Sequence, residues 1–188
     1  PPVPIFIEKC VDTLKLFFGA VYAGCFYVLL NPELPAVRIS HKAETLEAKL
    51  IVTEKARTEA LKEILSQAEV VTFEELLAEE SDENTLLSIR ENMIDTDPLY
   101  ANFTSGSTGV PKGVLISHRS VIDFIDNFTE IFSITQEDVI GNQAPFDIDV
   151  SVKDIYSAVK TGETLQIIHK ALYNSPACLI DHICEREK

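Results

Sequence analysis

A run of small and hydroxyl-bearing residues between two apolar segments is the part of the sequence best suited to bind phosphate groups. Its members are Thr104, Ser105, Gly106, Ser107, Thr108 and Gly109. Glycine lets the backbone turn tightly and present successive N–H groups, which together form a concavity that binds anions. The hydroxyl groups add donors, and nearby Lys112 adds a mobile positive charge. The run therefore predicts a loop that binds a polyphosphate.

This loop differs from the common nucleotide-binding motifs. A Walker A loop needs the pattern GxxxxGK[ST], whereas Lys112 lies between Pro111 and Gly113. The dinucleotide pattern GxGxxG does not match either. A kinase or P-loop NTPase is therefore not favoured. Composition alone would also allow a flexible connection between two strands.

Short apolar segments alternate with amphipathic ones along the chain, and these elements must position the loop. We expect strands at 3–7, 26–30, 50–53, 70–72, 99–103, 113–117, 139–144 and 165–169. We expect helices at 11–23, 37–48, 54–65, 73–77, 119–132, 151–160 and 176–187. This alternation predicts an α/β fold, a parallel sheet with helices on both faces.

Several residues are placed to begin or end these elements. Gly24 and Gly162 follow helical segments and are expected to end them. Ser151 and Asp154 have the spacing of a capping box at the start of the helix 151–160. Residues 79–97 are acidic, and we interpret them as a solvated connection with a modest helical patch at 86–90.

The overall charge of the protein disfavours some classes of binding partner. The 188 residues include 16 basic and 30 acidic ones, for a formal net charge of -14. Such a surface repels phosphate backbones and anionic lipid, so nucleic-acid and membrane binding are disfavoured. The longest uncharged apolar stretch, 16–30, is interrupted by Gly19 and Gly24 and is shorter than the roughly 18 residues of a membrane span.

The cysteines and histidines do not suggest a metal site. Cys10, Cys25, Cys178 and Cys184 form no CxxC pair and have no histidine at metal-ligand spacing. We expect buried, reduced thiols in a cytoplasmic protein. His41, His169 and His182 have no companion groups and are assigned no role.

The loop and its flanks resemble the adenylate-forming superfamily, which includes acyl-CoA synthetases, luciferases and adenylation domains of nonribosomal peptide synthetases. Residues 104–113 are similar to the signature loop of that family. Residues 16–28 with 31–35 resemble the second core motif of amino-acid adenylation domains, a structural motif. Residues 151–156 with 162–165 resemble the fourth core motif. The resemblance implies part of the large N-terminal domain of an adenylate-forming enzyme.

The register of the fourth motif decides which carboxylate faces the substrate. Alignment on Ser151 and Gly162 places Asp149 at the aspartate that, in amino-acid-activating members, binds the substrate α-ammonium group. Ile148 then occupies an aromatic position, a departure for which Phe146 is the alternative. Asp147 is the second candidate for the substrate role. For both aspartates the structural alternative is an interaction with the helix dipole.

The same alignment assigns two further residues, and a third is considered from its place after the loop. Val150 and Lys153 correspond to positions that line the side-chain pocket. Lys153 could bind an acidic substrate, pair with Asp149 or Asp154, or be a solvated helix residue, which we favour. His118 follows the strand after the loop, and we favour a polar residue that starts a helix over a contact near the nucleotide.

The resemblance covers almost all of the chain, but a YGPTE-like segment, a TGD and the lid lysine of the family do not occur in it. We therefore interpret 1–188 as an incomplete N-terminal domain, with α/β units in 1–78, the acidic connection in 79–97, the strand–loop–strand in 98–117, and further α/β units in 118–188.

The expected parent activity uses ATP and Mg²⁺ to form an aminoacyl-AMP and pyrophosphate. It then passes the aminoacyl group to the phosphopantetheine thiol of a peptidyl or D-alanyl carrier protein. The chain alone is expected to be inactive. An acyl- or aryl-CoA ligase, or a non-catalytic binding module, is the alternative.

Overall fold

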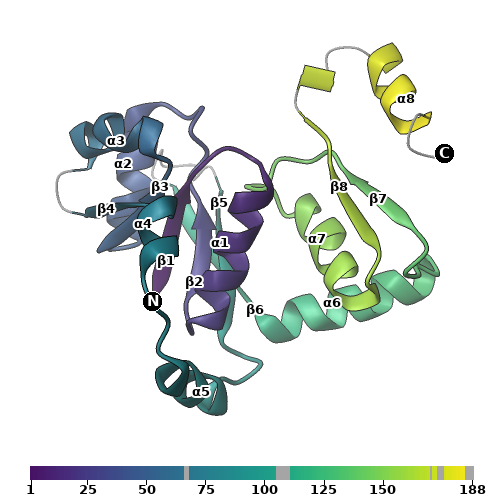
Figure 1. The fold of residues 1–188 in the computed structure, drawn as a ribbon, viewed down its shortest axis with the longest axis horizontal. Coiled ribbons are helices and arrows are strands. Elements are labelled where there is room, and N and C mark those ends of the chain that lie inside the picture. The colour runs from purple at the N-terminus through teal and green to yellow at the C-terminus, as the bar shows by residue number, and fades with distance from the viewer. Residues whose placement is uncertain (66–67, 105–110, 170, 173–175, 185–188) are drawn as a thin grey trace. The chain divides into compact units, whose positions relative to one another are not determined.

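The computed structural model describes residues 1–65, 68–104, 111–169, 171–172 and 176–184. The chain divides into two compact units, Pro1–Asp123 and Phe124–Lys188. Figure 1 shows the elements of both units. Helix α6 (His118–Ile131) begins in the first unit and ends in the second.

The first unit contains a six-stranded sheet in the order β4-β3-β1-β2-β5-β6. Its strands are β1 (Pro2–Phe6), β2 (Phe26–Leu29), β3 (Leu50–Thr53), β4 (Glu69–Thr72), β5 (Pro98–Thr104) and β6 (Lys112–Ser117). The first five are parallel, as predicted, and β6 is antiparallel to β5. A parallel partner requires a long crossover, and the segment between β5 and β6 is too short for one.

The helices of this unit are α1 (Val11–Tyr22), α2 (Ala36–Thr45), α3 (Thr58–Ile64), α4 (Phe73–Ala78) and α5 (Glu83–Asn92), with a 3₁₀ turn η1 (Lys55–Arg57). They lie on both faces of the sheet (Figure 1). On one face Phe17 of α1 stacks on Tyr27, with ring centroids 4.0 Å apart. On the other, α2 and α3 cover a buried cluster that includes Val28 and Ile51. Helix α1 connects β1 to β2 in one direction, and α2 connects β2 back across β1 to β3 in the other. Right-handed crossovers in opposite directions place their helices on opposite faces of the sheet.

Residues 79–97 contain more structure than the sequence suggested. The ten-residue helix α5 has Asp82 as its N-cap, and the Asp82 carboxylate accepts hydrogen bonds from the N–H groups of Asn84 and Thr85. Gly24 ends α1 with a φ of 70°, and an added Cβ there would lie 2.6 Å from Ile89 of α5. The short α4 begins with a capping box formed by Thr72 and Glu75.

The second unit holds a two-stranded parallel sheet, β7 (Val139–Asn142) and β8 (Thr164–Ile167), against which α7 (Val150–Thr161) packs. Helix α8 (Pro176–Cys184) follows. Gly162 ends α7 in the left-handed conformation, with a φ of 78°, as its position predicted.

The predicted capping box at the start of α7 is wrong. The N-cap is Asp149, and the Ser151 hydroxyl instead donates to the Ile148 carbonyl oxygen at 2.8 Å. Asp154 is buried and accepts a hydrogen bond from the Asn142 amide at 2.9 Å. The helix begins one residue earlier than predicted, so both side chains already lie inside it.

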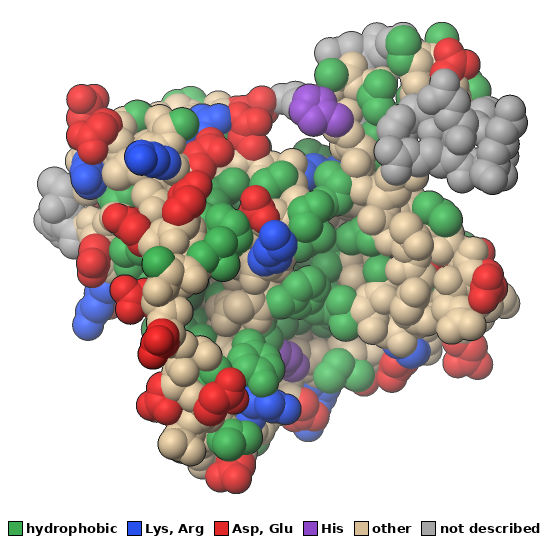
Figure 2. All heavy atoms as spheres, viewed as in Figure 1, with side chains coloured by type: hydrophobic (Ala, Val, Ile, Leu, Met, Phe, Trp, Pro, Cys, Tyr) green, Lys and Arg blue, Asp and Glu red, His purple; other side chains and the backbone are tan. Residues whose placement is uncertain are grey.

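The surface carries the acidic excess of the sequence. Figure 2 shows acidic side chains spread over the visible face rather than gathered in one patch. No helix in the described part of the chain is long and apolar enough to cross a membrane. Cys10 and Cys25 are only half-buried and Cys178 is exposed, so the prediction of buried thiols is wrong for these three.

Candidate functional site

The predicted phosphate loop joins the two strands of a β-hairpin. In the pairing of β5 with β6, Phe103 lies opposite Gly113 and Thr104 lies opposite Lys112. The Thr104 hydroxyl donates to the Lys112 carbonyl oxygen at 3.5 Å. Both residues are exposed where the loop begins and ends.

Five of the predicted phosphate-binding residues lie outside the described part of the chain: Ser105, Gly106, Ser107, Thr108 and Gly109. Thr104 and Lys112 are described, and the strand pairing brings these two together. The described ends of the loop are thus held by a regular hairpin.

The hairpin ends at the carboxyl edge of the parallel sheet. β5 pairs with β2, and β1 and β3 end at the same edge. The chain leaves β1 toward β2 and then crosses back over β1 to β3, so its connections diverge there. In open α/β sheets such a switch point leaves a crevice beyond the carboxyl ends of the strands, where ligands bind. The hairpin therefore presents the loop at the edge where a nucleotide site is expected.

A charged cluster at this edge was not found from the sequence. The Arg57 guanidinium pairs with Glu54, which follows β3, and with Glu8, which follows β1. The Thr13 hydroxyl also donates to the Glu8 carbonyl oxygen at 2.6 Å. These residues are distant in sequence, and the only signal was that each glutamate follows a buried strand. The cluster ties the ends of two adjacent strands together.

The opposite end of the hairpin is held by hydrogen bonds between the segment before β5 and the start of α6. The Arg119 guanidinium donates to both carboxylate oxygens of Asp95 at 2.8 Å. The backbone N–H groups of His118 and Arg119 donate to the carbonyl oxygens of Asp97 and Asp95. The base of the hairpin is therefore fixed independently of its loop.

His118 begins α6, as its position predicted. Burial lowers the pKa of its imidazole, and the negative charge of Asp97 partly offsets this effect. Among the described residues its Nε2 atom is buried without a hydrogen-bond partner. The lowered pKa favours the neutral form of the imidazole.

In the second unit, the residues predicted for the substrate site lie around the start of α7. Phe146 is buried, Asp147 is half-buried, and Val150 is exposed. Asp149 is exposed, and its side chain makes no capping hydrogen bond to α7. Asp149 is nevertheless the N-cap residue of α7, so its position fits the alternative of a carboxylate that interacts with the helix dipole.

Lys153 is held by two neighbours. Its ammonium pairs with Asp154 and lies 5.8 Å from the centroid of the Phe128 ring. The side chain is 35% exposed, so the favoured prediction of a solvated lysine is wrong, whereas the alternative of a pair with Asp154 is confirmed. This pairing partly neutralises a carboxylate that is otherwise buried.

Glu163, between α7 and β8, is a buried carboxyl group that sequence analysis missed. It is 6% exposed, and both carboxyl oxygens lack a hydrogen-bond partner among the described residues. Burial raises its pKa, and the negative charges of Asp138 and Asp154 raise it further. Its position after Gly162 in sequence gives no hint of this environment.

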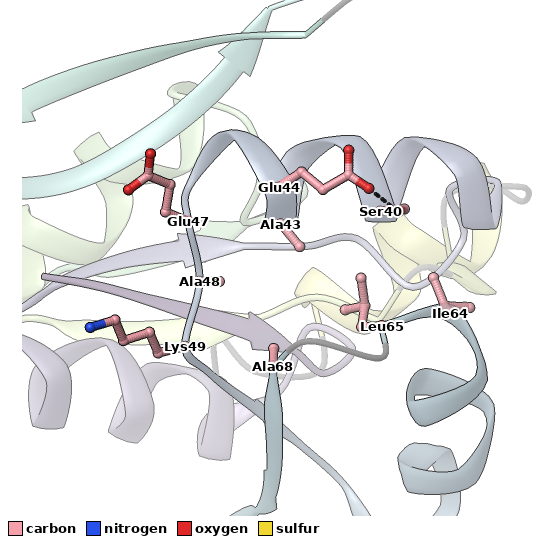
Figure 3. A pocket seen from close by; sticks show the side chains of 9 residues that line it. All are labelled: Ser40, Ala43, Glu44, Glu47, Ala48, Lys49, Ile64, Leu65 and Ala68. Atoms are coloured by element: carbon pink, nitrogen blue, oxygen red, sulfur yellow. Dashed lines mark hydrogen bonds between the residues drawn. The ribbon is translucent and has the colours of Figure 1, made fainter.

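A pocket of about 450 Å³ lies in the first unit between the ends of α2 and α3. Figure 3 shows the side chains that line the pocket, among them the Ser40 hydroxyl, which donates a hydrogen bond to the Glu44 carboxylate. Lys49 and Ala68 line it and immediately precede β3 and β4. The pocket is thus at the amino edge of the sheet, opposite the edge that carries the hairpin loop.

Comparison with known proteins identifies the family. The AMP-binding enzyme family matches residues 1–187. The chain therefore belongs to the AMP-binding enzyme family.

Two relatives illustrate how much of such proteins the chain represents. It is 34% identical to a D-alanine–D-alanyl carrier protein ligase of Bacillus velezensis, over 97% of this chain and 35% of the relative. It is 27% identical to tyrocidine synthase 1 of Brevibacillus parabrevis, over 98% of this chain and 17% of the relative. The chain thus spans about a third or less of the length of these relatives.

A solved structure confirms the fold. The four-domain nonribosomal peptide synthetase holo-AB3403, bound to AMP and glycine, superimposes with a TM-score of 0.80 at 22% identity. The alignment covers 97% of this chain and 13% of that one. The expected α/β fold of an adenylate-forming enzyme is therefore present.

Proposed function

We propose that the protein is part of a ligase that activates an amino acid with ATP, forms an aminoacyl-AMP and releases pyrophosphate. The observation that carries this proposal is the family match over residues 1–187. The hairpin at the carboxyl edge of the sheet supports it, because it presents a glycine- and hydroxyl-rich loop where α/β sheets bind ligands.

In this proposal the loop binds the β- and γ-phosphates of ATP. Thr104 and Lys112 hold its two ends, with Ser105, Gly106, Ser107, Thr108 and Gly109 between them. The backbone N–H groups, hydroxyls and the lysine neutralise charge that moves onto the departing pyrophosphate. Mg²⁺ is proposed to accompany the nucleotide phosphates, because Mg²⁺ is commonly held by substrate phosphates with one or two carboxylates.

Asp149 is proposed to bind the α-ammonium group of the amino acid. It lies at the start of α7 and is exposed, so a ligand can reach its carboxylate there. Val150 and Phe146 are proposed for the side-chain pocket, with Lys153 at its wall. Because Lys153 pairs with Asp154, selection of an acidic substrate would require that pair to open.

The acceptor is proposed to be the phosphopantetheine thiol of a peptidyl or D-alanyl carrier protein, in the cytoplasm. The support comes from relatives named as a D-alanyl carrier protein ligase and an L-prolyl-carrier protein ligase of Pseudomonas fluorescens, the latter 30% identical over 97% of this chain and 38% of the relative.

The test is amino-acid-dependent ATP–pyrophosphate exchange by the full-length protein, with no turnover expected from residues 1–188 alone. Asp149→Asn should raise the KM for the amino acid at least roughly tenfold, since a charge-assisted contact to the substrate is lost. Asp147→Asn, the matched control, should change it less.

Exchange supported only by fatty or aryl acids would contradict the amino-acid assignment and favour an acyl- or aryl-CoA ligase. An equal effect of the two asparagine variants would overturn the assignment of the ammonium site to Asp149.

A further inference from the structure

The pocket at the amino edge of the first unit has an apolar floor. Its volume of about 450 Å³ lies within the range of roughly 300–1,000 Å³ that small-molecule sites occupy. Ala43 and Leu65 in its lining are buried members of the hydrophobic core cluster. Ala48, Ile64 and Ala68 are partly buried and pack against that cluster. A ligand in the pocket therefore lies directly on the core and covers apolar surface.

Two side chains of opposite charge line one end of this pocket. Figure 3 shows Glu47 and Lys49 on either side of Ala48, with the apolar side chains from the end of α3 farther along. Both charged side chains are exposed, and among the described residues neither forms an ion pair or a side-chain hydrogen bond. Glu44, by contrast, accepts a hydrogen bond from Ser40 at 2.9 Å. This end of the pocket thus offers a ligand one negative and one positive charge.

Glu47 occupies a backbone position that glycine normally fills. Its φ is 49°, in the left-handed region, where a side chain strains the backbone. The N–H groups of Glu47 and Ala48 donate to the carbonyl oxygens of Glu44 and Ala43, at 3.0 and 3.1 Å. These two bonds form a Schellman motif, in which glycine is the usual residue at the left-handed position. A glutamate here lowers stability, so the fold of α2 does not explain why this position carries a carboxylate.

We propose that this pocket binds a free apolar amino acid, at a site separate from the one proposed around Asp149. The ammonium group of the ligand binds Glu47, its carboxylate binds Lys49, and its side chain lies on the apolar floor. An amino acid carries both charged groups and its side chain on one Cα atom, which matches two charges at one end of the pocket and apolar surface beyond them. A simple anion or cation would meet a like charge next to its partner. The inference does not depend on the proposed function of the hairpin loop.

The experiment is an NMR titration of the chain with L-phenylalanine, with phenethylamine, which lacks the carboxylate, and with 3-phenylpropionate, which lacks the ammonium group. L-Phenylalanine should shift the signals of Ala43, Ala48 and Leu65. It should bind roughly two- to fivefold more tightly than either analogue, as expected for one exposed charge contact. Glu47→Gln should remove its advantage over 3-phenylpropionate, and Lys49→Gln should remove its advantage over phenethylamine.

Three further variants test whether the two charges act on the ligand. Glu63→Gln and Lys62→Gln remove the same charges from α3 outside the pocket lining, and they should leave the three dissociation constants nearly unchanged. Glu47→Gly relieves the left-handed strain, so it should raise the melting temperature by about 1–3 °C. It should also weaken L-phenylalanine binding as much as Glu47→Gln does. Unchanged binding in Glu47→Gly would show that the carboxylate has no ligand role and would overturn the proposal.

The position of the shifted signals separates this site from the proposed substrate site. Equal affinity for the three compounds, or no shift at the pocket residues, would overturn the second site. Shifts confined to Val150 and Val152 of α7 that disappear in Asp149→Asn would also overturn it, but they would support the proposed function. Conversely, a full-length protein without amino-acid-dependent pyrophosphate exchange would contradict the proposed function and leave binding in the pocket standing.

Discussion

Two buried carboxyl groups of the second unit differ in whether they have polar partners. The Asp154 carboxylate contacts the Lys153 ammonium and the Asn142 amide, whereas the Glu163 carboxyl group has no hydrogen-bond partner among the described residues. A buried carboxylate is stable when it is paired, and an unpaired one favours its neutral form. Two single-residue predictions follow from this contrast.

Lys153→Met should destabilise the second unit by roughly 1–3 kcal/mol, because it leaves the Asp154 carboxylate buried with less compensation. The double variant Lys153→Met, Asp154→Asn should recover part of this loss, since the buried charge is gone. Urea unfolding of the wild type, of Lys153→Met, of Asp154→Asn and of the double variant gives the coupling free energy. A coupling free energy near zero would show that the pair contributes nothing.

Glu163→Gln should raise the melting temperature at pH 7 by a few degrees and change it little near pH 4. The pKa of Glu163 is raised in the folded protein. At a pH above the usual pKa of a glutamate, the unfolded chain therefore loses the Glu163 proton while the folded protein still holds it. The contribution of Glu163 to the free energy of unfolding is therefore fully present at low pH, and it decreases as the pH rises toward the folded-state pKa. Differential scanning calorimetry across pH 4–8 measures this dependence.

Glu137→Gln is the matched control for Glu163, because Glu137 is exposed in the same unit. Its effect on the melting temperature should be small. A Glu163→Gln variant that follows the wild-type pH dependence in parallel would contradict the assignment.

At the scale of elements, two glycines of the first unit differ in whether their position can accept a larger side chain. Gly24 has a φ of 70°, and a Cβ there would lie 2.6 Å from the Ile89 side chain. Gly19 is inside α1, and a Cβ there meets nothing within 4 Å. Gly24 thus fixes the end of α1 beside α5, while Gly19 leaves the helix less stable than alanine would.

Gly24→Ala should lower the unfolding free energy by roughly 1–3 kcal/mol, through left-handed backbone strain and overlap with Ile89. Gly19→Ala should instead raise it by roughly 0.5–1 kcal/mol. Chemical unfolding of the two glycine variants measures both changes. Adding Ile89→Ala to Gly24→Ala should recover only the part of the lost unfolding free energy that is due to overlap with Ile89. Destabilisation of equal size in both glycine variants would show that α1 tolerates no added methyl group at all.

The sequence anticipated most elements because their apolar periodicity and glycine ends are local signals. The prediction of a phosphate loop also rests on a local signal, because Thr104 to Gly109 and Lys112 lie close together in the sequence, and its binding role stays a prediction. The antiparallel direction of β6 follows from the short connection between β5 and β6, so it could have been predicted from the sequence. The Arg57 cluster, the burial of Glu163 and the pocket between α2 and α3 could not, because they depend on how distant elements pack.

At the scale of the whole molecule, the acidic excess opposes the compact state. Ion pairs in the described part offer little relief, because most have exposed partners, such as Asp95 with Arg119 and Asp12 with Lys15. Exposed pairs each contribute about 1 kcal/mol or less, while like charges repel over the whole surface. Repulsion should therefore dominate the net electrostatic contribution to folding.

The melting temperature should consequently rise by several degrees between 10 and 200 mM NaCl, well before protein–salt exclusion effects are large. Screening weakens both attraction and repulsion, so the sign of the change reports which one is greater. Choline chloride should act like NaCl, whereas an uncharged solute of equal osmolarity should not reproduce the effect. Chloride salts are preferred to phosphate, because phosphate could bind the predicted loop and stabilise the fold by mass action. A melting temperature that falls with added salt would mean that the ion pairs at Arg119, Arg57 and Lys153 outweigh the net charge of -14.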